Sequence, residues 1–153
     1  MRSGVPINAL NAVRKHLSAV KGGQLAECLA PARTVGLLFS DVASDDPAVI
    51  ASGPLTPDET TYQDAIDVLA RYEVSVSENV RSYLEAGASG TYTETPSSDD
   101  QSFRYISQQV IASNHTALTA AAETCAEAGY EPPLLSSSIS ADARDDATFL
   151  ASI

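Results

Sequence analysis

The sequence lacks tryptophan, contains only two cysteines and two lysines among its 153 residues, and has no long apolar run. Because crossing a bilayer takes about 20 consecutive apolar residues, we expect no membrane helix. The N-terminal MRSGVPINAL also lacks the basic start and apolar stretch of a signal peptide. Cys28 and Cys125 alone cannot form a disulfide framework. These absences together predict a cytoplasmic protein.

Positive charge is scarce as well. Nine basic residues stand against twenty acidic ones, which gives a net charge of −11. Free nucleic acid and anionic membrane surfaces are therefore excluded as expected partners. An acidic chain with so little lysine is typical of a halophilic protein, and an ordinary acidic protein is the alternative.

The first half of the chain alternates helix and strand patterns. Apolar residues three and four apart predict a helix over 8–20, which ends before Gly22 and Gly23. A shorter helix is expected over 24–29, stopped by Pro31. The apolar run TVGLLF, residues 34–39, is typical of a strand buried in a parallel sheet. A loop rich in Asp, Ser, Gly and Pro follows over 40–60.

The second half continues this alternation, in one α/β domain. Helices are expected over 61–71, over 77–84 and from a cap at Asn114 to Gly129, with strands over 108–112 and 134–139 and a last helix over 143–153. The polar stretch 87–101 is predicted to be a mobile surface loop. This order predicts a parallel sheet with flanking helices, a Rossmann-like three-layer fold in an incomplete domain.

One segment before residue 24 gathers positive charge. At about 100° per residue its polar side chains share one predicted helix face. They are Asn11, Arg14, Lys15, Ser18 and Lys21. Arginine and lysine suit phosphate oxygens, and the Gly22–Gly23 pair lets backbone N–H groups approach an anion. The alternative is a solvated basic face at a helix C-terminus, where cations are favourable anyway. His16, beside this face, is expected to be a helix-face or capping residue.

Two further segments follow the first predicted strand. Asp41, Asp45 and Asp46 should lie beyond its carboxyl end, where ligands of open α/β sheets gather. Such carboxylates hold Mg²⁺ together with substrate phosphates, or accept a hydroxyl proton, although serine and aspartate also cap turns. The sequence ASGPLTPD, residues 51–58, is dense in turn formers and predicts a shaped loop.

Taken together, these segments resemble the type II glycerate kinases. NAVRKHLSAVKGG, SDVASDD and IASGPLTPDETT match three motifs of that family in the same order, and VIASNHTALTAAAETCAEAGY and ADARDDATFLASI are also similar to it. The resemblance implies phosphoryl transfer from ATP to the 2-hydroxyl of D-glycerate, with Mg²⁺. Some members are labelled hydroxypyruvate reductases, but this sequence has no G-x-G-x-x-G dinucleotide fingerprint.

The resemblance also implies roles for individual residues. Lys15 and Lys21 would neutralise phosphate oxygens, with Asp41 beside them in catalysis, and Asp41 and Asp45 would be metal ligands. The remaining substrate and phosphate contacts would come from Asn11, Arg14, Ser18, Gly22, Gly23, Ser52, Gly53 and Asp58. Ser44 and Leu55 depart from the family pattern, and Asp142 stands where the family has glutamate.

The resemblance covers only part of the family pattern. A glycine-rich phosphate loop and a second domain, both typical of the family, have no counterpart in these 153 residues. We therefore expect the chain alone to be inactive, and to form a homo-oligomer or to need a complementary chain. The alternatives are an anion-binding or nucleotide-binding module without catalysis, and a degenerate fragment that folds by pairing with another copy.

Overall fold

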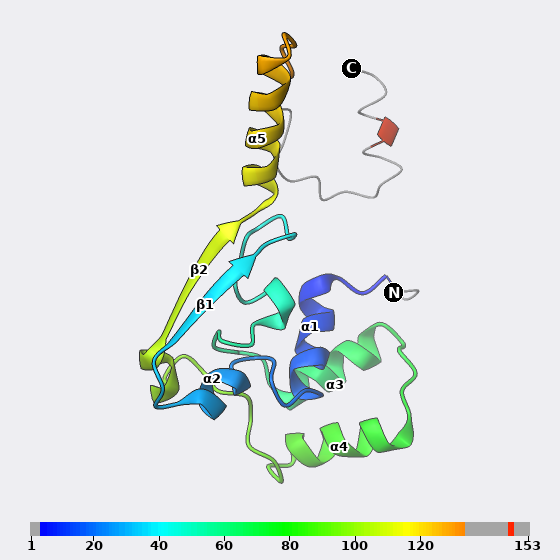
Figure 1. The fold of residues 1–153 in the computed structure, drawn as a ribbon. Coiled ribbons are helices and arrows are strands. Elements are labelled where there is room, and N and C mark those ends of the chain that lie inside the picture. Colours follow the sequence, from blue (N-terminus) through cyan, green and yellow to red (C-terminus); the bar gives the residue numbers. More distant parts are fainter. Residues whose placement is uncertain (1–3, 134–146, 149–153) are drawn as a thin grey trace. The chain divides into compact units, whose positions relative to one another are not determined.

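Two parallel strands form the sheet of this protein, seen in a computed structural model that describes residues 4–133 and 147–148. They are β1, Thr34–Phe39, and β2, Ile106–Ala112, and they run side by side (Figure 1). The α-helices within residues 4–133 are α1 Ile7–His16, α2 Gln24–Leu29, α3 Tyr62–Arg71, α4 Glu78–Ala88 and α5 Asn114–Glu127, and two 3₁₀ helices span Ile50–Ser52 and Gln101–Tyr105. The predicted fold class, a parallel sheet with flanking helices, is confirmed.

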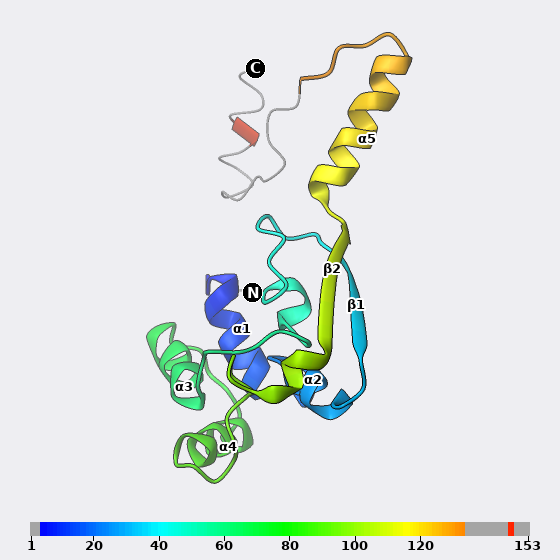
Figure 2. The same cartoon turned by 90° about the vertical axis from the view of Figure 1, so that its left-hand side faces the viewer.

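The chain divides into two units. The first comprises Met1–Leu37 and Asp46–Gln109, and the second Leu38–Asp45 and Val110–Ile153. Helices α1 to α4 belong to the first unit, and α5 belongs to the second (Figure 2). Within the described ranges, no helix has the length and apolar character needed to span a bilayer.

The core of the first unit lies where α1, α3 and α4 meet. Val13 of α1 packs against Tyr62 and Ala65 of α3 and Leu84 of α4. Gly87 of α4 lies directly on the Tyr62 ring, because a Cβ at this position would be only 2.4 Å from two of the ring carbons. The start of α3 is fixed by a capping box between Thr61 and Asp64.

The first helix is shorter than predicted. It ends at His16, and the apolar side chains of Leu17 and Val20, which continue its spacing, are 42% and 47% exposed. The reason lies in Gln24, whose Nε2 donates to the carbonyl oxygens of Lys15, Ser18 and Lys21 at 3.1, 2.7 and 2.9 Å. These carbonyls converge on one amide, so the chain turns instead of continuing as a helix. The predicted helix over 8–20 is therefore wrong beyond residue 16.

The first strand has the predicted bounds, but one of its faces is open. Side chains alternate between the two faces of a strand. Gly36 is buried, whereas Val35, Leu37 and Phe39 are 69%, 60% and 73% exposed in the part of the chain that the structure describes. The prediction of a buried strand is wrong for this face.

Most other predicted elements agree within a few residues. The second strand and α4 are longer than expected, and Ser113, not Asn114, caps α5 by accepting from the Thr116 N–H. Gly129, with φ of +86°, follows the end of α5 as predicted. The strand expected over 134–139 lies outside the described residues, as does the helix over 143–153 apart from residues 147–148.

The polar loop between α4 and the 3₁₀ helix Gln101–Tyr105 contains buried residues that its composition does not suggest. Thr95 and Pro96 are buried within it. Its predicted mobility stays a prediction, but these two residues anchor its middle to the first unit.

Candidate functional site

The glycine pair after α1 lies against the loop over residues 51–58. The Gly22 N–H donates to the Ser52 carbonyl at 3.0 Å, and the Gly23 N–H donates to the Gly53 carbonyl at 2.8 Å. Gly22, Gly23, Ser52 and Gly53 all have positive φ, between 59° and 81°. The expectation that the two glycine N–H groups face an anion is therefore wrong in this structure, because loop carbonyls accept both.

Gly22 also permits a close approach inside the first unit. A Cβ on this residue would lie 3.0 Å from both the Lys15 Cβ and Asp58 Oδ2. Real Cβ atoms rarely make contacts this close, and the φ of +59° is itself unfavourable for other residues. The glycine therefore lets the chain pass directly over the Lys15–Asp58 pair.

Lys15 and Asp58 form a buried ion pair. The Lys15 Nζ lies 3.0 Å from Asp58 Oδ1, and the two residues are 8% and 2% exposed. Oδ1 also accepts from the Thr60 N–H and hydroxyl at 3.1 and 2.8 Å, while Oδ2 accepts from the Thr95 hydroxyl at 3.0 Å. Both carboxylate oxygens thus accept hydrogen bonds, so Asp58 orients Lys15 and shapes its loop.

A chain of contacts joins the other two cations. The Arg14 guanidinium donates to Asn11 Oδ1 at 3.3 Å, and the Ser52 hydroxyl donates to the same oxygen at 3.0 Å. Next to Ser52, the Ala51 carbonyl accepts from the Lys21 Nζ at 2.9 Å. The structure thus brings Arg14 and Lys21 to the two ends of one short polar network around Asn11 and Ser52.

The five polar side chains predicted to share one helix face do not all lie on a helix, because α1 ends at His16. Ser18 and Lys21 lie beyond the end of α1, and the Ser18 hydroxyl accepts from the Val20 N–H at 3.2 Å. Lys21 still joins the network, but through the turn after the helix. Asn11 and Lys15 lie on α1 yet are buried, so this face is not the solvated surface that the alternative interpretation requires.

Two of the three predicted aspartates belong to the second unit. Asp41 and Asp45 follow the end of β1, where the Ser40 N–H donates to the Ala112 carbonyl at 2.8 Å. Asp41 is exposed, and Asp45 is half-buried with φ of +50°. No group of three or more potential ligands gathers among the described residues. Two carboxylates fit Mg²⁺ only if phosphate oxygens or water supply the remaining ligands, as is usual for this ion.

Sequence reasoning missed the contacts of His16 and Glu94. His16 is only 2% exposed, and its ring lies edge-on to Tyr62 with the centroids 4.7 Å apart. Glu94, 78 residues later, accepts from or pairs with the His16 Nε2 at 3.1 Å. No local pattern indicates this contact, because Glu94 stands in a polar stretch without periodicity.

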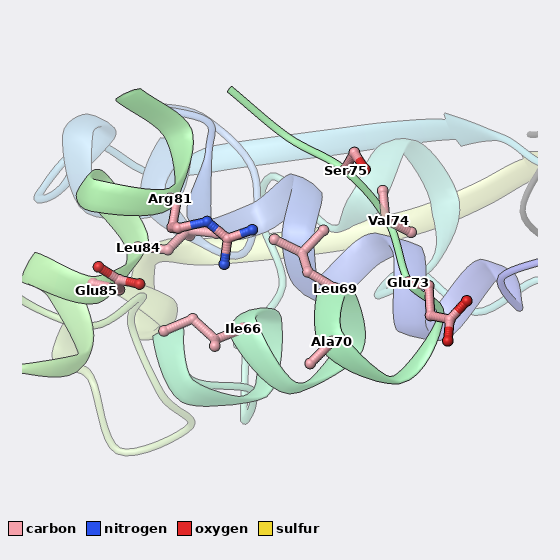
Figure 3. A pocket seen from close by; sticks show the side chains of 9 residues that line it. All are labelled: Ile66, Leu69, Ala70, Glu73, Val74, Ser75, Arg81, Leu84 and Glu85. Atoms are coloured by element: carbon pink, nitrogen blue, oxygen red, sulfur yellow. The ribbon is translucent and has the colours of Figure 1, made fainter. Parts of the chain in front are cut away.

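A separate cavity of about 280 Å³ opens between α3 and α4. Ile66, Leu69 and Leu84 line it, and Figure 3 shows the Arg81 side chain extending from α4 toward Leu69. None of the residues predicted to bind phosphate or substrate lines this cavity. It is therefore distinct from the Lys15–Asp58 pair and from the polar network around Asn11 and Ser52.

Comparison with known proteins decides the family. A family model described as "Domain of unknown function (DUF4147)" matches residues 1–85 of the chain. The chain belongs to this family. The DUF4147 match covers α1 to α3, the loop of residues 51–58 and most of α4. It therefore includes all the residues predicted to bind phosphate, substrate or metal.

Relatives connect this DUF4147 protein to the glycerate kinases. It is 36% identical to the D-glycerate 2-kinase of Thermotoga maritima and 40% identical to a putative hydroxypyruvate reductase of Agrobacterium vitis, over all 153 of its residues. The crystal structure of the Thermotoga maritima glycerate kinase matches with a TM-score of 0.73 over 99% of the chain, at 36% identity. The resemblance to type II glycerate kinases is confirmed. The chain spans 34% of the length of the Thermotoga maritima kinase, 38% of the Agrobacterium vitis protein and 34% of the solved chain.

Proposed function

We propose that the chain supplies the phosphate-binding part of a glycerate 2-kinase, which transfers a phosphoryl group from ATP to the 2-hydroxyl of D-glycerate. The names of its relatives support this class of reaction. Because the chain spans about a third of their length, its substrates and activity belong to the proposal.

The observation that carries the proposal is the state of Arg14 and Lys21. Among the described basic residues, Lys15 and His16 are the ones that lie against carboxylates, those of Asp58 and Glu94, so neither Arg14 nor Lys21 faces a carboxylate. Their partners, Asn11 Oδ1 and the Ala51 carbonyl, are neutral. Two uncompensated cations at the ends of one network, in a chain of net charge −11, favour an anionic ligand such as a phosphate group.

The three cations then have different tasks. Arg14 and Lys21 contact phosphate oxygens directly, while Asp58 holds the Lys15 ammonium in a fixed position. Preorganised charge of this kind stabilises the transferring phosphoryl group without reorganisation during the reaction. The Asn11 side-chain N–H groups and the Ser18 hydroxyl would donate to the ligand, Ser52 holds the Asn11 oxygen, and Gly22, Gly23 and Gly53 shape the loop.

Asp41 and Asp45 are the proposed magnesium ligands. A Mg²⁺ ion held by these carboxylates would supply positive charge that offsets the charge of the phosphate groups. Asp41 is also the candidate to accept the hydroxyl proton of glycerate, since it lies in solvent directly after a strand. Its role as base or as metal ligand is part of the proposal.

The isolated chain should bind phosphate-bearing ligands without turning over. Phosphoryl transfer depends on holding cations and both reacting oxygens together, and this chain spans only part of the kinases it matches. Charge-assisted hydrogen bonds contribute roughly 1.5–3 kcal/mol each. Two such bonds, reduced by the entropy cost of association, give a net binding free energy that corresponds to a millimolar dissociation constant.

A calorimetric titration with ATP and Mg²⁺ tests this proposal, beside a coupled kinase assay with D-glycerate. Lys21→Met should weaken binding about tenfold, a loss of about 1.4 kcal/mol. Arg71→Met is the matched control, because it removes one exposed charge that stacks on Tyr72 outside the network. Equal effects of the two substitutions would contradict a specific phosphate site. Robust turnover by the 153-residue chain would contradict its expected inactivity.

A further inference from the structure

Both ring nitrogens of His16 face hydrogen-bond acceptors. The Nδ1 lies 2.8 Å from the Ala12 carbonyl oxygen, and the Nε2 lies 3.1 Å from Glu94 Oε2. A neutral imidazole has one N–H donor and one lone pair, whereas a carbonyl and an ionised carboxylate can only accept. The arrangement is therefore satisfied by an imidazolium that donates on both sides and forms an ion pair with Glu94.

Glu94 contacts both α1, at His16, and α3, at the Tyr62 N–H. Its two carboxylate oxygens accept from the Tyr62 N–H, at 3.1 Å for Oε1 and 3.0 Å for Oε2. Tyr62 is the first residue of α3, where backbone N–H groups lack partners within the helix. One carboxylate in the polar loop thus joins the last residue of α1 to the first turn of α3.

Two other ionisable groups, Asp64 and Tyr62, lie near His16. Asp64 lies in the first turn of α3, and hydrogen bonds from Thr61 lower the pKa of its carboxyl, with a smaller contribution from His16. The Tyr62 phenol makes a hydrogen bond with the Tyr83 phenol, and burial raises the pKa of Tyr62, so this group stays neutral. Glu94 and Asp64 are therefore the carboxyl groups that interact with His16.

The residues after Glu94 reach the Lys15 pair. Thr95 donates from its hydroxyl to Asp58 Oδ2 at 3.0 Å, and the Pro96 carbonyl accepts from the Asp58 N–H at 3.0 Å. Asp58 in turn holds Lys15, the neighbour of His16 on α1. Residues 94–96 therefore contact two neighbouring side chains of α1. Glu94 contacts His16 directly, and Thr95 and Pro96 reach Lys15 through Asp58.

We propose that Glu94 is a positioning residue for Lys15, which it holds in place through an ionic bond to the His16 imidazolium. The ion pair needs an ionised Glu94 carboxylate and an imidazolium ring at His16. Losing it frees residues 94–96 and weakens the hold of Thr95 on Asp58. An effect of Glu94 on phosphate affinity rests on the proposed function. An effect of Glu94 on the position of the Lys15 ammonium does not.

Nitrogen NMR of the labelled chain tests the ion pair directly. The protein has two histidines, so His16→Gln identifies the His16 ring signals. At neutral pH, both ring nitrogens of His16 should show the chemical shifts of protonated nitrogen. In Glu94→Gln, whose amide can donate to Nε2, the ring should change to a neutral form with its proton on Nδ1. A neutral His16 ring in the wild-type protein at neutral pH would overturn the proposal without any variant.

The Lys15 ammonium provides the second readout. A buried, ion-paired ammonium exchanges its protons slowly, and we expect Glu94→Gln to speed the exchange at Lys15 at least fivefold. Glu59→Gln is the matched control, because Glu59 also accepts from this loop, at the Ser98 N–H, without touching His16. Unchanged exchange in Glu94→Gln, or an equal change in Glu59→Gln, would overturn the positioning role.

Titration of the same variants with ATP and Mg²⁺ separates this proposal from the proposed function. If Glu94→Gln alters Lys15 exchange but Lys21→Met and Lys15→Met leave ATP binding unchanged, the positioning role stands and the phosphate site fails. If Lys21→Met weakens binding and Glu94→Gln leaves Lys15 exchange unchanged, the phosphate site stands and the positioning role fails.

Discussion

The Lys15 ammonium lies 3.0 Å from Asp58 Oδ1, and the pair is buried beneath Gly22. An ion pair removed from water is strongly coupled, because either partner left alone is an uncompensated buried charge. The pair therefore connects the end of α1 with the loop of residues 51–58, and the stability of each segment depends on the other.

Asp58→Asn tests this coupling. The substitution keeps the shape of the side chain but leaves Lys15 charged and unpaired, so it should lower the free energy of unfolding by about 3–5 kcal/mol in urea titrations. Adding Lys15→Met should recover part of this loss, because the buried charge is then absent. Glu59→Gln, at the exposed neighbouring position, should change stability by no more than about 0.5 kcal/mol. A small effect of Asp58→Asn would show that the pair contributes little.

Gly22→Ala tests the close approach over this pair. The alanine Cβ would lie 3.0 Å from both Lys15 and Asp58 at a φ of +59°. Gly90→Ala is the matched control, because Gly90 has φ of +84° with no atom within 4 Å of the added Cβ. The positive φ alone costs about 1 kcal/mol, and crowding should add a further ~1–3 kcal/mol at residue 22. Equal destabilisation of the two variants in urea would show that the contact is not tight.

Local patterns in the sequence predict the elements of this fold but not their partners. The strand over 34–39 and the helices after Thr61 and Ser77 lie within a few residues of their predicted bounds, because their residue patterns are local. Leu17 and Val20 continue the spacing of α1, yet α1 stops because the Gln24 amide gathers three carbonyls. That contact depends on the shape of a turn, and the spacing of apolar residues does not predict a turn of this shape.

The candidate site shows the same limit. Its segments could be identified from residue types, because clustered cations, glycines and turn formers point to anion binding. The pairing of Lys15 with Asp58 and of His16 with Glu94 joins residues 43 and 78 positions apart. A single sequence contains no signal for such pairs, and the Glu94 stretch has the composition of an ordinary surface loop.

High salt should stabilise the chain. A net charge of −11 over 153 residues makes the folded state repel itself, and salt screens this repulsion over a Debye length of about 3 Å at 1 M. We expect the midpoint of thermal unfolding to rise from dilute buffer to molar KCl. Sodium sulfate at matched ionic strength separates screening from a general salting-out effect. An unchanged or lower midpoint in KCl would contradict the halophilic interpretation.

Self-association is the last prediction, and it follows from the open face of β1. Val35 and Leu37 lie two residues apart on this face and are 69% and 60% exposed, and Phe39 continues the row at 73%. Apolar rows of this kind favour a partner surface, because burying them releases about 25 cal/mol per Å². We therefore expect a dimer or larger species by multi-angle light scattering at micromolar concentration.

Leu37→Gln should shift this equilibrium toward the monomer, since it places a polar group in the middle of the row. Leu29→Gln is the matched control, because Leu29 is 37% exposed at the end of α2 and not on β1. If association runs through the face of β1, the dissociation constant rises at least tenfold in Leu37→Gln and stays within about twofold in Leu29→Gln, a difference of about 1 kcal/mol or more. A monomeric wild-type chain, or equal effects of the two substitutions, would show that this face does not drive association.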